Sequence, residues 1–321
     1  MGPDYLAAHP VLASLQGRDF LTLRDFSPEE IQALVDLACE LKRLQKEGKP
    51  HRLLPGKTLA MLFYKSSTRT RISFEVGIYQ LGGHAVVLNA NELQLGRGET
   101  IEDTARVLSR FVDGLMIRTF AQRDVELLAE YADIPIINGL TDLYHPCQVL
   151  ADLQTIYERV GALKGLKVTY IGDGNNMAHS LAIGCVKMGM ETVICTPPDY
   201  KPLPEVIAYV ERLAAETGGS IALQDDPLEA AAGAHVLYTD VWVSMGQEEE
   251  MAQRRADFAL WRVDAALMAH AGPDAIAMHC LPAHRGDEMT DDVLDGPASR
   301  IWDQAENRLH SARGLLAWLC G

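Results

Sequence analysis

The sequence predicts an α/β protein of two similar domains, each a parallel sheet flanked by helices. Short apolar runs that fit buried parallel strands alternate with segments of helical spacing along most of the chain. The pattern restarts after Gly165, and 321 residues suit two domains of about 150 residues each. We therefore expect a boundary at residue 150, with residues 1–150 in one domain and residues 151–321 in the other.

The first domain is expected to begin with a packing helix and to continue as four strands. Ser27 precedes Pro28 and Glu30, which is the pattern of a capping box at a helix start. The expected strands are 58–63, 84–88, 115–117 and 134–137. The expected helices are 68–81, 122–131, one that opens at Pro146 and one that Thr100 caps. In the helix 68–81, the apolar residues at helical spacing are Ile72, Val76, Tyr79 and Leu81. In the helix that Thr100 caps, the residues expected to face inward are Ile101, Ala105, Leu108 and Phe111.

The second domain shows the same alternation. Its expected strands are 167–171, 192–195, 221–224, 235–238 and 275–278. Its expected helices are 175–188, 203–216 and a short one before the fourth strand, and a helical tail runs from residue 298 to 319. Alternating strands and helices favour a second parallel sheet.

The amino-acid composition of the chain limits which molecules it can bind and the compartment in which it is expected. The chain carries 44 acidic against 29 basic residues, a formal charge of −15, which argues against a nucleic acid or an acidic membrane as partner. Six cysteines show no CxxC pairing and the first residues have neither a basic segment nor a long apolar run, so we expect a reducing cytoplasm. No window approaches the roughly 20 apolar residues needed to cross a bilayer. An anionic ligand therefore needs a local basic cluster.

The densest such cluster is Lys65–Arg71, written KSSTRTR, between an expected strand and an expected helix. Free backbone N–H groups and the helix dipole favour an anion at such a turn. Ser67, Thr68 and Thr70 add hydroxyl donors, and Arg69 adds a planar fork that suits phosphate. The alternative is an ordinary helix cap with a solvated basic turn, but arginines there oppose the dipole unless an anion is present. We therefore predict a phosphate-type ligand.

Other polar side chains stand at the carboxyl ends of expected strands, where open α/β sheets bind ligands. They are Arg118, His145, Asn175, Asn176, Asp240, His279 and Cys280. Arg118 has a surface salt bridge as its alternative role, and Asp240 a helix cap. His145 and Gln148 can aim at one ligand oxygen, or His145 simply precedes a helix. Asp240 can hold an amine while Ser244 donates to a carboxyl group.

Two cofactor interpretations are weaker. The turn Gly172–Met177 lacks the third glycine of the GxGxxG fingerprint, since Met177 stands in its place, which counts against a nicotinamide dehydrogenase. His279, Cys280 and His284 do not match common zinc spacings. We expect neither a cofactor nor a metal.

Together these segments resemble the aspartate/ornithine transcarbamoylase family. The segments that carry the resemblance follow the family order: STRTR at Ser67–Arg71, HPCQ at His145–Gln148, DVWVSMG at Asp240–Gly246, HCLP at His279–Pro282 and ENR at Glu306–Arg308. The resemblance covers nearly the whole chain and implies transfer of a carbamoyl group from carbamoyl phosphate to an amine. The DxxxSMG and HCLP segments imply L-ornithine as the acceptor, because an aspartate-using member is expected to carry a PLP-type segment in place of HCLP.

The resemblance also implies roles for single residues. It assigns to carbamoyl phosphate Ser67, Thr68, Arg69, Thr70, Gln94, Arg118, His145, Gln148, Cys280, Leu281 and Arg308. It assigns to ornithine Asn176, Asp240, Ser244 and Met245, and the expected catalytic set is Arg69, Arg118, His145, Asp240 and Cys280. Gln94 resembles a residue that reaches a neighbouring subunit's site, which implies a homotrimer. The C-terminal helix, at about residues 298–320, is expected to return to the carbamoyl-phosphate-binding first domain.

The mechanism that these roles imply follows from charge. The δ-amine attacks the carbamoyl carbon and phosphate leaves, while Arg118, His145 and Thr70 polarise the carbonyl and Arg69 stabilises the leaving group. An alkylamine has a pKa of about 10.4, so Asp240 and Cys280 are expected to position it as it loses its proton. The alternatives are an enzyme for putrescine or N-acetylornithine, a dehydrogenase, or a non-catalytic subunit that binds carbamoyl phosphate.

Overall fold

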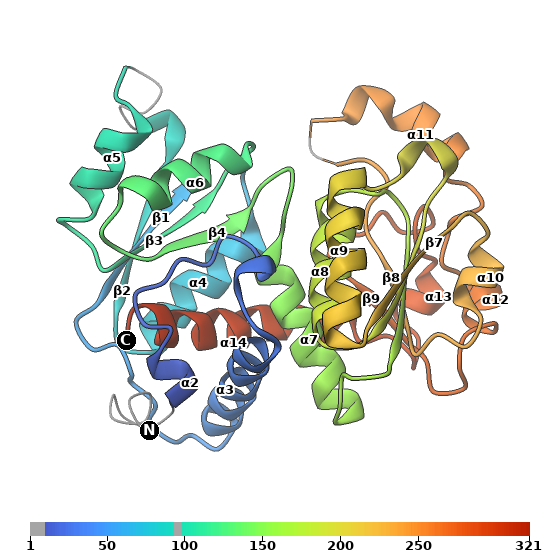
Figure 1. Cartoon of the computed structure of the whole chain (residues 1–321), viewed down its shortest axis with the longest axis horizontal. Coiled ribbons are helices and arrows are strands. Elements are labelled where there is room, and N and C mark those ends of the chain that lie inside the picture. Colours follow the sequence, from blue (N-terminus) through green and yellow to red (C-terminus); the bar gives the residue numbers. More distant parts are fainter. Residues whose placement is uncertain (1–9, 93–97, 245) are drawn as a thin grey trace. The chain divides into compact units, whose positions relative to one another are not determined.

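A computed structural model describes residues 10–92, 98–244 and 246–321. The chain divides into two compact units: unit 1 is Met1–Gln154 with Glu306–Gly321, and unit 2 is Thr155–Ala305. The divisions fall inside two helices, α7 (Pro146–Val160) and α14 (Ile301–Leu319). Each unit contains one parallel sheet with helices on both sides, which confirms the predicted α/β class (Figure 1).

Unit 1 is built on a four-stranded parallel sheet in the order β2-β1-β3-β4. The strands are β1 (Thr58–Phe63), β2 (His84–Asn89), β3 (Gly114–Arg118) and β4 (Ile136–Leu140). The strand β1 has the predicted bounds, because its apolar run is continuous and buried. The strand β4 begins at Ile136 instead of residue 134 and extends through Asn138 and Gly139, which were predicted to follow it.

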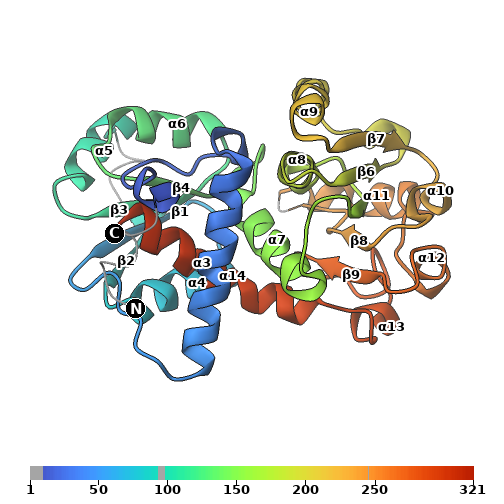
Figure 2. The same cartoon turned by 60° about the horizontal axis from the view of Figure 1, so that its bottom comes forward.

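Helices cover both faces of this sheet. They are α2 (Pro10–Ala13), η1 (Leu23–Asp25), α3 (Pro28–Lys46), α4 (Thr68–Gln80), η2 (Ala90–Glu92), α5 (Ile101–Leu108) and α6 (Gln122–Tyr131), with the unit 1 parts of α7 and α14. Figures 1 and 2 place α5 and α6 on one side of the strands and α4 and α14 on the other. The helix α3 begins with the predicted capping box, since Glu30 N donates to Ser27 Oγ at 3.2 Å and Ser27 N donates to Glu30 Oε2 at 2.8 Å.

The return of the C-terminal helix depends on a close approach at Gly314. A Cβ atom there would lie 3.3 Å from both the carbonyl oxygen of Leu34 and the Cβ of Ala38, so glycine lets α14 pack against α3. The side chain of Arg313 donates from Nη2 to the carbonyl oxygen of Leu41 at 3.0 Å. From Glu306 onward, the last helix is therefore an integral part of unit 1.

The apolar spacing noted in α4 does not mark its buried face, and one residue of the predicted inward face of α5 was wrong. In α4, Ile72 and Tyr79 are 55% and 77% exposed, whereas Phe74 and Ile78 are buried. Both faces carry apolar residues at helical spacing, and the position of the sheet decides which one is buried. Phe111 is 74% exposed because α5 already ends at Leu108, so this side chain lies in the following turn instead of on the helix.

Unit 2 contains a five-stranded parallel sheet in the order β7-β6-β5-β8-β9. The strands are β5 (Lys167–Ile171), β6 (Glu191–Cys195), β7 (Ser220–Gln224), β8 (Val236–Thr239) and β9 (Ile276–His279). The longer helices are α8 (Asn176–Lys187) and α9 (Pro204–Thr217). The shorter elements are η4 (Pro198–Tyr200), α10 (Pro227–Ala231), η5 (Glu248–Glu250), α11 (Met251–Asp257), α12 (Ala265–Met268) and α13 (Asp291–Leu294).

The helices α8 and α9 lie on one face of this sheet, and α10, α12 and α13 lie on the other (Figures 1 and 2). Residues from Met177 to Lys187 of α8 are all buried, so this helix lies in the interior of the unit. On the opposite face, Trp242, Phe258 and Trp261 anchor an apolar cluster that includes Ile171 and Leu237 of the sheet. The turn after β5 and the loop after β8 are thereby fixed to a rigid core.

All six cysteines are free thiols. Within residues 10–92, 98–244 and 246–321, no helix has both the length and the hydropathy that crossing a membrane requires.

Candidate functional site

Each sheet has one topological switch point, and the predicted site residues follow the strands on either side of it. In unit 1 the strand order reverses between β1 and β3. Ser67–Thr70 follow β1, and Arg118 ends β3. In unit 2 the order reverses between β5 and β8, where Asn175 and Asp240 follow the two strands. Ligands in open α/β sheets bind outside the carboxyl ends of strands at such points.

In unit 1, Ser67 caps the helix that follows β1. Its backbone is extended, with φ at −159°, and its Oγ accepts from the backbone N–H of Thr70 at 3.2 Å. The first turn of α4 contains no acidic residue, while it carries Arg69 and Arg71. The positive end of the helix dipole and these guanidinium groups therefore favour an anion at this turn.

A guanidinium from the last helix joins this turn to α7. Arg308 donates from Nη1 to Gln148 Oε1 at 2.6 Å and from Nη2 to Thr70 Oγ1 at 3.2 Å. Gln148 in turn donates from Nε2 to Asp152 Oδ1 at 2.8 Å, and Asp152 is fully buried. The amide of Gln148 thus has a fixed orientation, with its carbonyl oxygen toward Arg308. This explains why the site requires the C-terminal helix.

His145 is neutral in this environment. Burial lowers its pKa well below 6.5, and the nearby cations Arg308, Arg118 and Arg69 lower it further, in that order. A neutral imidazole can donate a hydrogen bond to a carbonyl oxygen without bringing a charge. Arg118 is only 7% exposed, so its alternative role in a surface salt bridge is wrong. The surroundings of His145 are strongly cationic and suit a small, highly charged anion.

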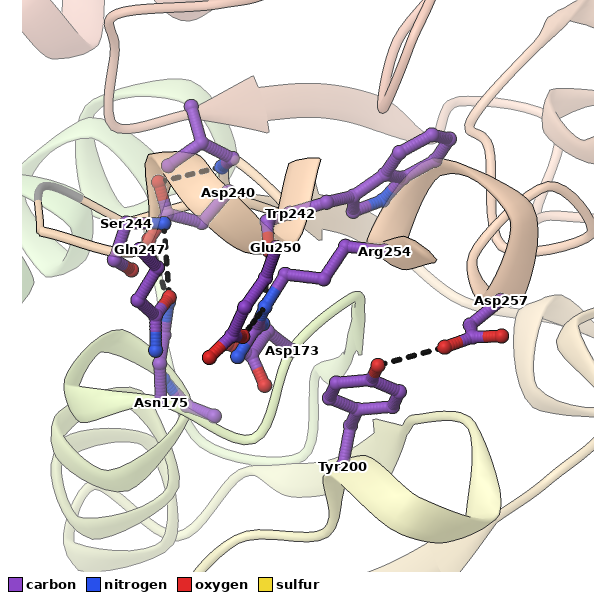
Figure 3. A network of polar contacts seen from close by, with 12 residues as sticks. Asp173, Asn175, Tyr200, Asp240, Trp242, Ser244, Gln247, Glu250, Arg254 and Asp257 are labelled. Atoms are coloured by element: carbon purple, nitrogen blue, oxygen red, sulfur yellow. Dashed lines mark hydrogen bonds and ion pairs between the residues drawn. The ribbon is translucent and has the colours of Figure 1, made fainter. Parts of the chain in front are cut away.

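In unit 2 the carboxylate of Asp240 accepts hydrogen bonds from three directions. Oδ1 accepts from the backbone N–H of Val241 and from Sγ of Cys280, both at 2.8 Å, and Oδ2 accepts from Nδ2 of Asn175 at 3.0 Å. Figure 3 shows Asp240 and Asn175 among the side chains around this carboxylate. Asp240 is 7% exposed and Cys280 9%. The three contacts fix the plane of the carboxylate.

The segment after β9 is shaped by a buried His–Glu pair. The N–H of Leu281 donates to Nδ1 of His279 at 2.8 Å, so the proton of this imidazole is assigned to Nε2, which lies 3.0 Å from Oε1 of Glu288. Both side chains of the pair are fully buried. Leu281 has φ at +58°, a left-handed conformation that costs a residue with a side chain about 1–2 kcal/mol. His279 stabilises this conformation next to Cys280.

Arg254 ties the loop after β8 to the turn after β5. It donates from Nη1 to Asp173 Oδ2 and to the carbonyl oxygen of Trp242, both at 2.9 Å, and from Nε to Glu250 Oε2 at 2.7 Å (Figure 3). Its guanidinium lies 4.9 Å from the ring centroid of Tyr200. Burial raises the pKa of Asp173 to about 6, although Arg254 opposes the shift. The two segments that carry Asn175 and Asp240 are therefore joined independently of those residues.

One group of side chains in the described part of the chain has the geometry to hold a metal ion. It consists of Asp240, His279 and Cys280, whose ligand atoms all lie within 4.8 Å of one another. Asp240 takes the place that the zinc alternative gave to His284, whose backbone N–H instead donates to Glu288 at 2.6 Å. These side chains already bind one another or Glu288, so hydrogen bonding accounts for the arrangement.

Known families contain relatives of both units. Residues 18–158 match the family model described as the carbamoyl-P binding domain of aspartate/ornithine carbamoyltransferase. Residues 164–319 match the model described as its Asp/Orn binding domain. The chain belongs to the aspartate/ornithine carbamoyltransferase family.

Relatives within this family are similar over nearly the full length. The chain is 58% identical over 311 residues to ornithine carbamoyltransferase of Thermococcus kodakarensis, which covers 97% of this chain and 99% of the relative. It is 57% identical to the anabolic ornithine carbamoyltransferase of Pyrococcus furiosus, with 97% and 99% covered. The solved structure of the Pyrococcus furiosus ornithine carbamoyltransferase superposes with a TM-score of 0.93 at 57% identity, covering 96% of this chain and 98% of that one.

The residues to which the carbamoyltransferase resemblance assigned roles lie in both units of the chain. Those assigned to carbamoyl phosphate fall in unit 1, except Cys280 and Leu281, which belong to unit 2 with the residues assigned to ornithine. Asn176 opens α8, and the backbone N–H of Ser244 donates to Oε1 of Gln247 at 3.1 Å. Gln94 and Met245 lie outside the described residues.

Two residues that shape these clusters were not predicted, Asp152 and Glu288, and a third, Asn175, was predicted at a strand end but not assigned to ornithine. Asn175 was noted at a strand end, but its neighbour Asn176 was chosen by resemblance. Asp152 lies one helical turn after Gln148, and this spacing could have indicated the contact. Glu288 stands nine positions after His279 in a loop, and no local pattern joins them.

Proposed function

We propose that this chain transfers the carbamoyl group of carbamoyl phosphate to the δ-amine of L-ornithine, giving L-citrulline and phosphate. The observation that carries the proposal is the cationic cluster of unit 1, in which Arg308 joins Gln148 to Thr70 at the N-terminus of α4. Membership of the carbamoyltransferase family and the names of relatives at 57–58% identity support the same reaction.

Carbamoyl phosphate binds to unit 1 in this proposal. Ser67, Thr68, Arg69 and Thr70 hold the phosphate, and Arg118, His145 and Gln148 hold the carbamoyl group. The neutral imidazole of His145 donates to the carbamoyl oxygen, where negative charge develops as the amine attacks. Arg69 and the N–H groups of the first turn of α4 stabilise the departing phosphate, whose charge increases as the bond breaks.

Ornithine binds to unit 2. Asn176, Ser244 and Met245 bind its amino-acid end, while Asp240 and Cys280 lie at the amine. The reacting amine must be neutral, although its pKa in water is about 10.4. Asp240 is a buried carboxylate that already accepts from the thiol of Cys280, so the pair can accept or relay the proton that the amine loses.

The domain roles follow the same division. We assign carbamoyl phosphate to residues 1–150 and ornithine to residues 151–321, with the helix at about 298–320 belonging functionally to the first domain through Arg308. The proposed compartment is a reducing cytoplasm, which suits six free thiols. The proposed pathway is arginine biosynthesis, in line with the word anabolic in the name of the Pyrococcus furiosus relative.

We propose that the enzyme is a homotrimer in which Gln94 reaches the site of a neighbouring subunit. Unit 1 exposes Ile72 and Tyr79 on α4 and Val86 on the edge strand β2, at 55%, 77% and 38%. Exposed apolar side chains on two elements that pack against each other support an interface between copies. Analytical ultracentrifugation is expected to give three times the chain mass of 35.3 kDa. A monomer at enzymatic concentrations would contradict this part of the proposal.

The proposed reaction is tested by an assay with carbamoyl phosphate and a panel of amines. Citrulline and an equal amount of phosphate are expected with L-ornithine, while putrescine and N-acetylornithine are expected to react at least about 100-fold more slowly in kcat/KM, because each lacks a charged group that the site is built to bind. A higher kcat/KM for putrescine or N-acetylornithine would assign the chain to that acceptor instead. The absence of any carbamoylated product would contradict the enzymatic assignment.

A further inference from the structure

We infer that Asn175 is a positioning residue for the transfer reaction: its amide holds the carboxylate of Asp240 in the orientation that the amine meets. The inference rests on the proposed function, because it gives a role to a contact of Asp240. Asn175 does not belong to the set assigned to ornithine.

The orientation of the Asn175 amide is fixed by the helix that it caps. Its Oδ1 accepts from the backbone N–H groups of Met177 at 2.9 Å and Ala178 at 3.3 Å. Backbone N–H groups only donate, so the carbonyl end of the amide must face them. The NH₂ end is left to face Asp240, and Nδ2 lies 3.0 Å from Oδ2. A flipped amide would place donors against donors on one side and an acceptor against a carboxylate on the other.

The hydrogen bond from Asn175 fixes Oδ2 of Asp240, whereas Oδ1 accepts from two other donors. Oδ1 accepts from Val241 and Cys280, whereas the donor to Oδ2 among the described residues is Asn175. Removing this donor leaves a nearly buried oxygen without a partner, which favours rotation of the carboxylate. Rotation also breaks the contact with the thiol of Cys280. One amide thus controls both members of the pair that we assign to the amine.

The effect of Asn175 is electrostatic as well as geometric. The titratable groups around this carboxylate are Tyr170, Asp173, His279 and Cys280. Glu288 lies behind them and pairs with His279. The charge of Asp173 is matched by Arg254 in the ion pair described above, at 2.9 Å. The NH₂ group of Asn175 is a neutral donor in this surrounding, so an acid in its place would change the local charge without changing the size of the side chain.

Asn175→Ser separates capping from positioning. Serine caps a helix about as well as asparagine, so the thermal stability is expected to stay close to that of the unchanged protein. Serine is too short to keep the donor to Asp240. The kcat is expected to fall about 10- to 100-fold, the range that misplacement of a reacting group produces. The KM for carbamoyl phosphate is expected to change less than about twofold, since its proposed ligands at Ser67–Thr70 belong to unit 1.

Asn175→Asp adds a readout that a purely structural cap does not give. Aspartate caps the helix at every pH at which it is ionised, but only its protonated form can donate to Asp240. The ratio of the variant's kcat to that of the unchanged protein is therefore expected to rise as the pH falls from 9 to 6. If Asn175 were only a cap, the ratio would stay flat or fall with the pH.

A matched control exchanges the same two residue types at another helix cap of unit 2. Asp264 caps α12 by accepting from the N–H of Leu267 at 2.9 Å. Asp264→Asn is expected to leave kcat and its pH profile unchanged. If Asp264→Asn changed kcat and its pH profile as Asn175→Asp does, the inference would be overturned, because both changes would then be effects of a helix cap.

The remaining outcomes separate this inference from the proposed function. If the unchanged protein forms citrulline and Asn175→Ser keeps its kcat, the inference is wrong and the function stands. If no citrulline forms at all, the function is wrong. A crystal structure of Asn175→Ser then still decides the inference, since we expect the Asp240 carboxylate to have turned away from Cys280 Sγ, and an unmoved carboxylate would overturn it.

Discussion

Cys280 is the residue whose chemistry the structure restricts most sharply. Its thiol donates to Asp240 at 2.8 Å, and its neighbours are held by the buried pair of His279 and Glu288. A thiol engaged with a carboxylate can return the proton it shares, so it suits a relay better than a structural role. The identity of the donor at this position should therefore matter more than its volume.

Two substitutions at Cys280 test this. Cys280→Ser keeps an O–H donor toward Asp240, while Cys280→Ala removes the donor and little volume. We expect Cys280→Ala to lower kcat by about 100-fold and to change its pH profile, and Cys280→Ser to retain more of the activity, because general acid–base groups contribute about 10²–10⁴-fold. Steady-state kinetics between pH 6 and 10 measure both. If Cys280→Ala leaves turnover and pH profile intact, Cys280 has no part in the proton transfer.

At the N-terminus of the helix α4, one residue, Ser67, has two roles. Ser67 caps the helix through the N–H of Thr70 and is also a proposed phosphate ligand. Ser67→Ala should cost about 1 kcal/mol in the free energy of unfolding, the usual value of such a cap. Ser67→Asp should keep the cap and its stability, yet abolish carbamoyl phosphate binding, because it places a negative charge where the phosphate sits.

Denaturant unfolding and isothermal titration with carbamoyl phosphate separate the two roles of Ser67. The expected result is a stable Ser67→Asp protein that does not bind the ligand. Undiminished binding by that variant would mean that the anion lies elsewhere than the N-terminus of α4.

The elements show why some of the fold could be predicted from sequence and some could not. The capping box of α3 and the strand β1 depend on neighbours in sequence, so their patterns were sufficient. The buried face of α4 depends on where the sheet lies, and both Ile72 and Phe74 fit a helical pattern. The short helices α11, α12 and α13 carry too few residues for a periodic signal.

For the candidate site residues, too, one part could be predicted from the sequence and another could not. Its residue types at the strand ends were predictable, because the carboxyl ends of parallel strands meet at one edge. The pairings within it were not, since Asn175 and Asp240 are 65 residues apart and Asp173 and Arg254 are 81 apart. Such contacts follow from the topology of the sheet, which a local pattern does not contain.

At the scale of the whole molecule, two buried histidines link stability to pH. Burial lowers the pKa of His310 to about 4, against an opposing contribution from Glu306 and with added lowering by Arg313 and Lys42. The pKa of His145 is also lowered. A histidine with a depressed pKa stays neutral in the folded chain while the unfolded chain binds a proton below pH 6.5. Its effect on folding is therefore absent at neutral pH and unfavourable in acid.

The free energy of unfolding is accordingly expected to fall as the pH drops from about 6.5 toward 4. His310→Gln, which keeps one donor and one acceptor but does not titrate, should make this fall smaller. Urea unfolding at a series of pH values measures the difference between the two proteins. Identical pH dependence in both would show that His310 does not carry the effect.

In the proposed mechanism the N-terminus of α4 holds the phosphate of carbamoyl phosphate, and Arg69 and Arg71 test this as a matched pair. Arg71 is exposed and pairs with Glu75 at 3.3 Å, whereas Arg69 lies near the buried imidazole of His145. We expect Arg69→Ala to lower phosphate release from carbamoyl phosphate and ornithine by about 100-fold or more, as loss of a donor to developing charge does, and Arg71→Ala to change it by less than about twofold. Equal rates for the two variants would contradict the account.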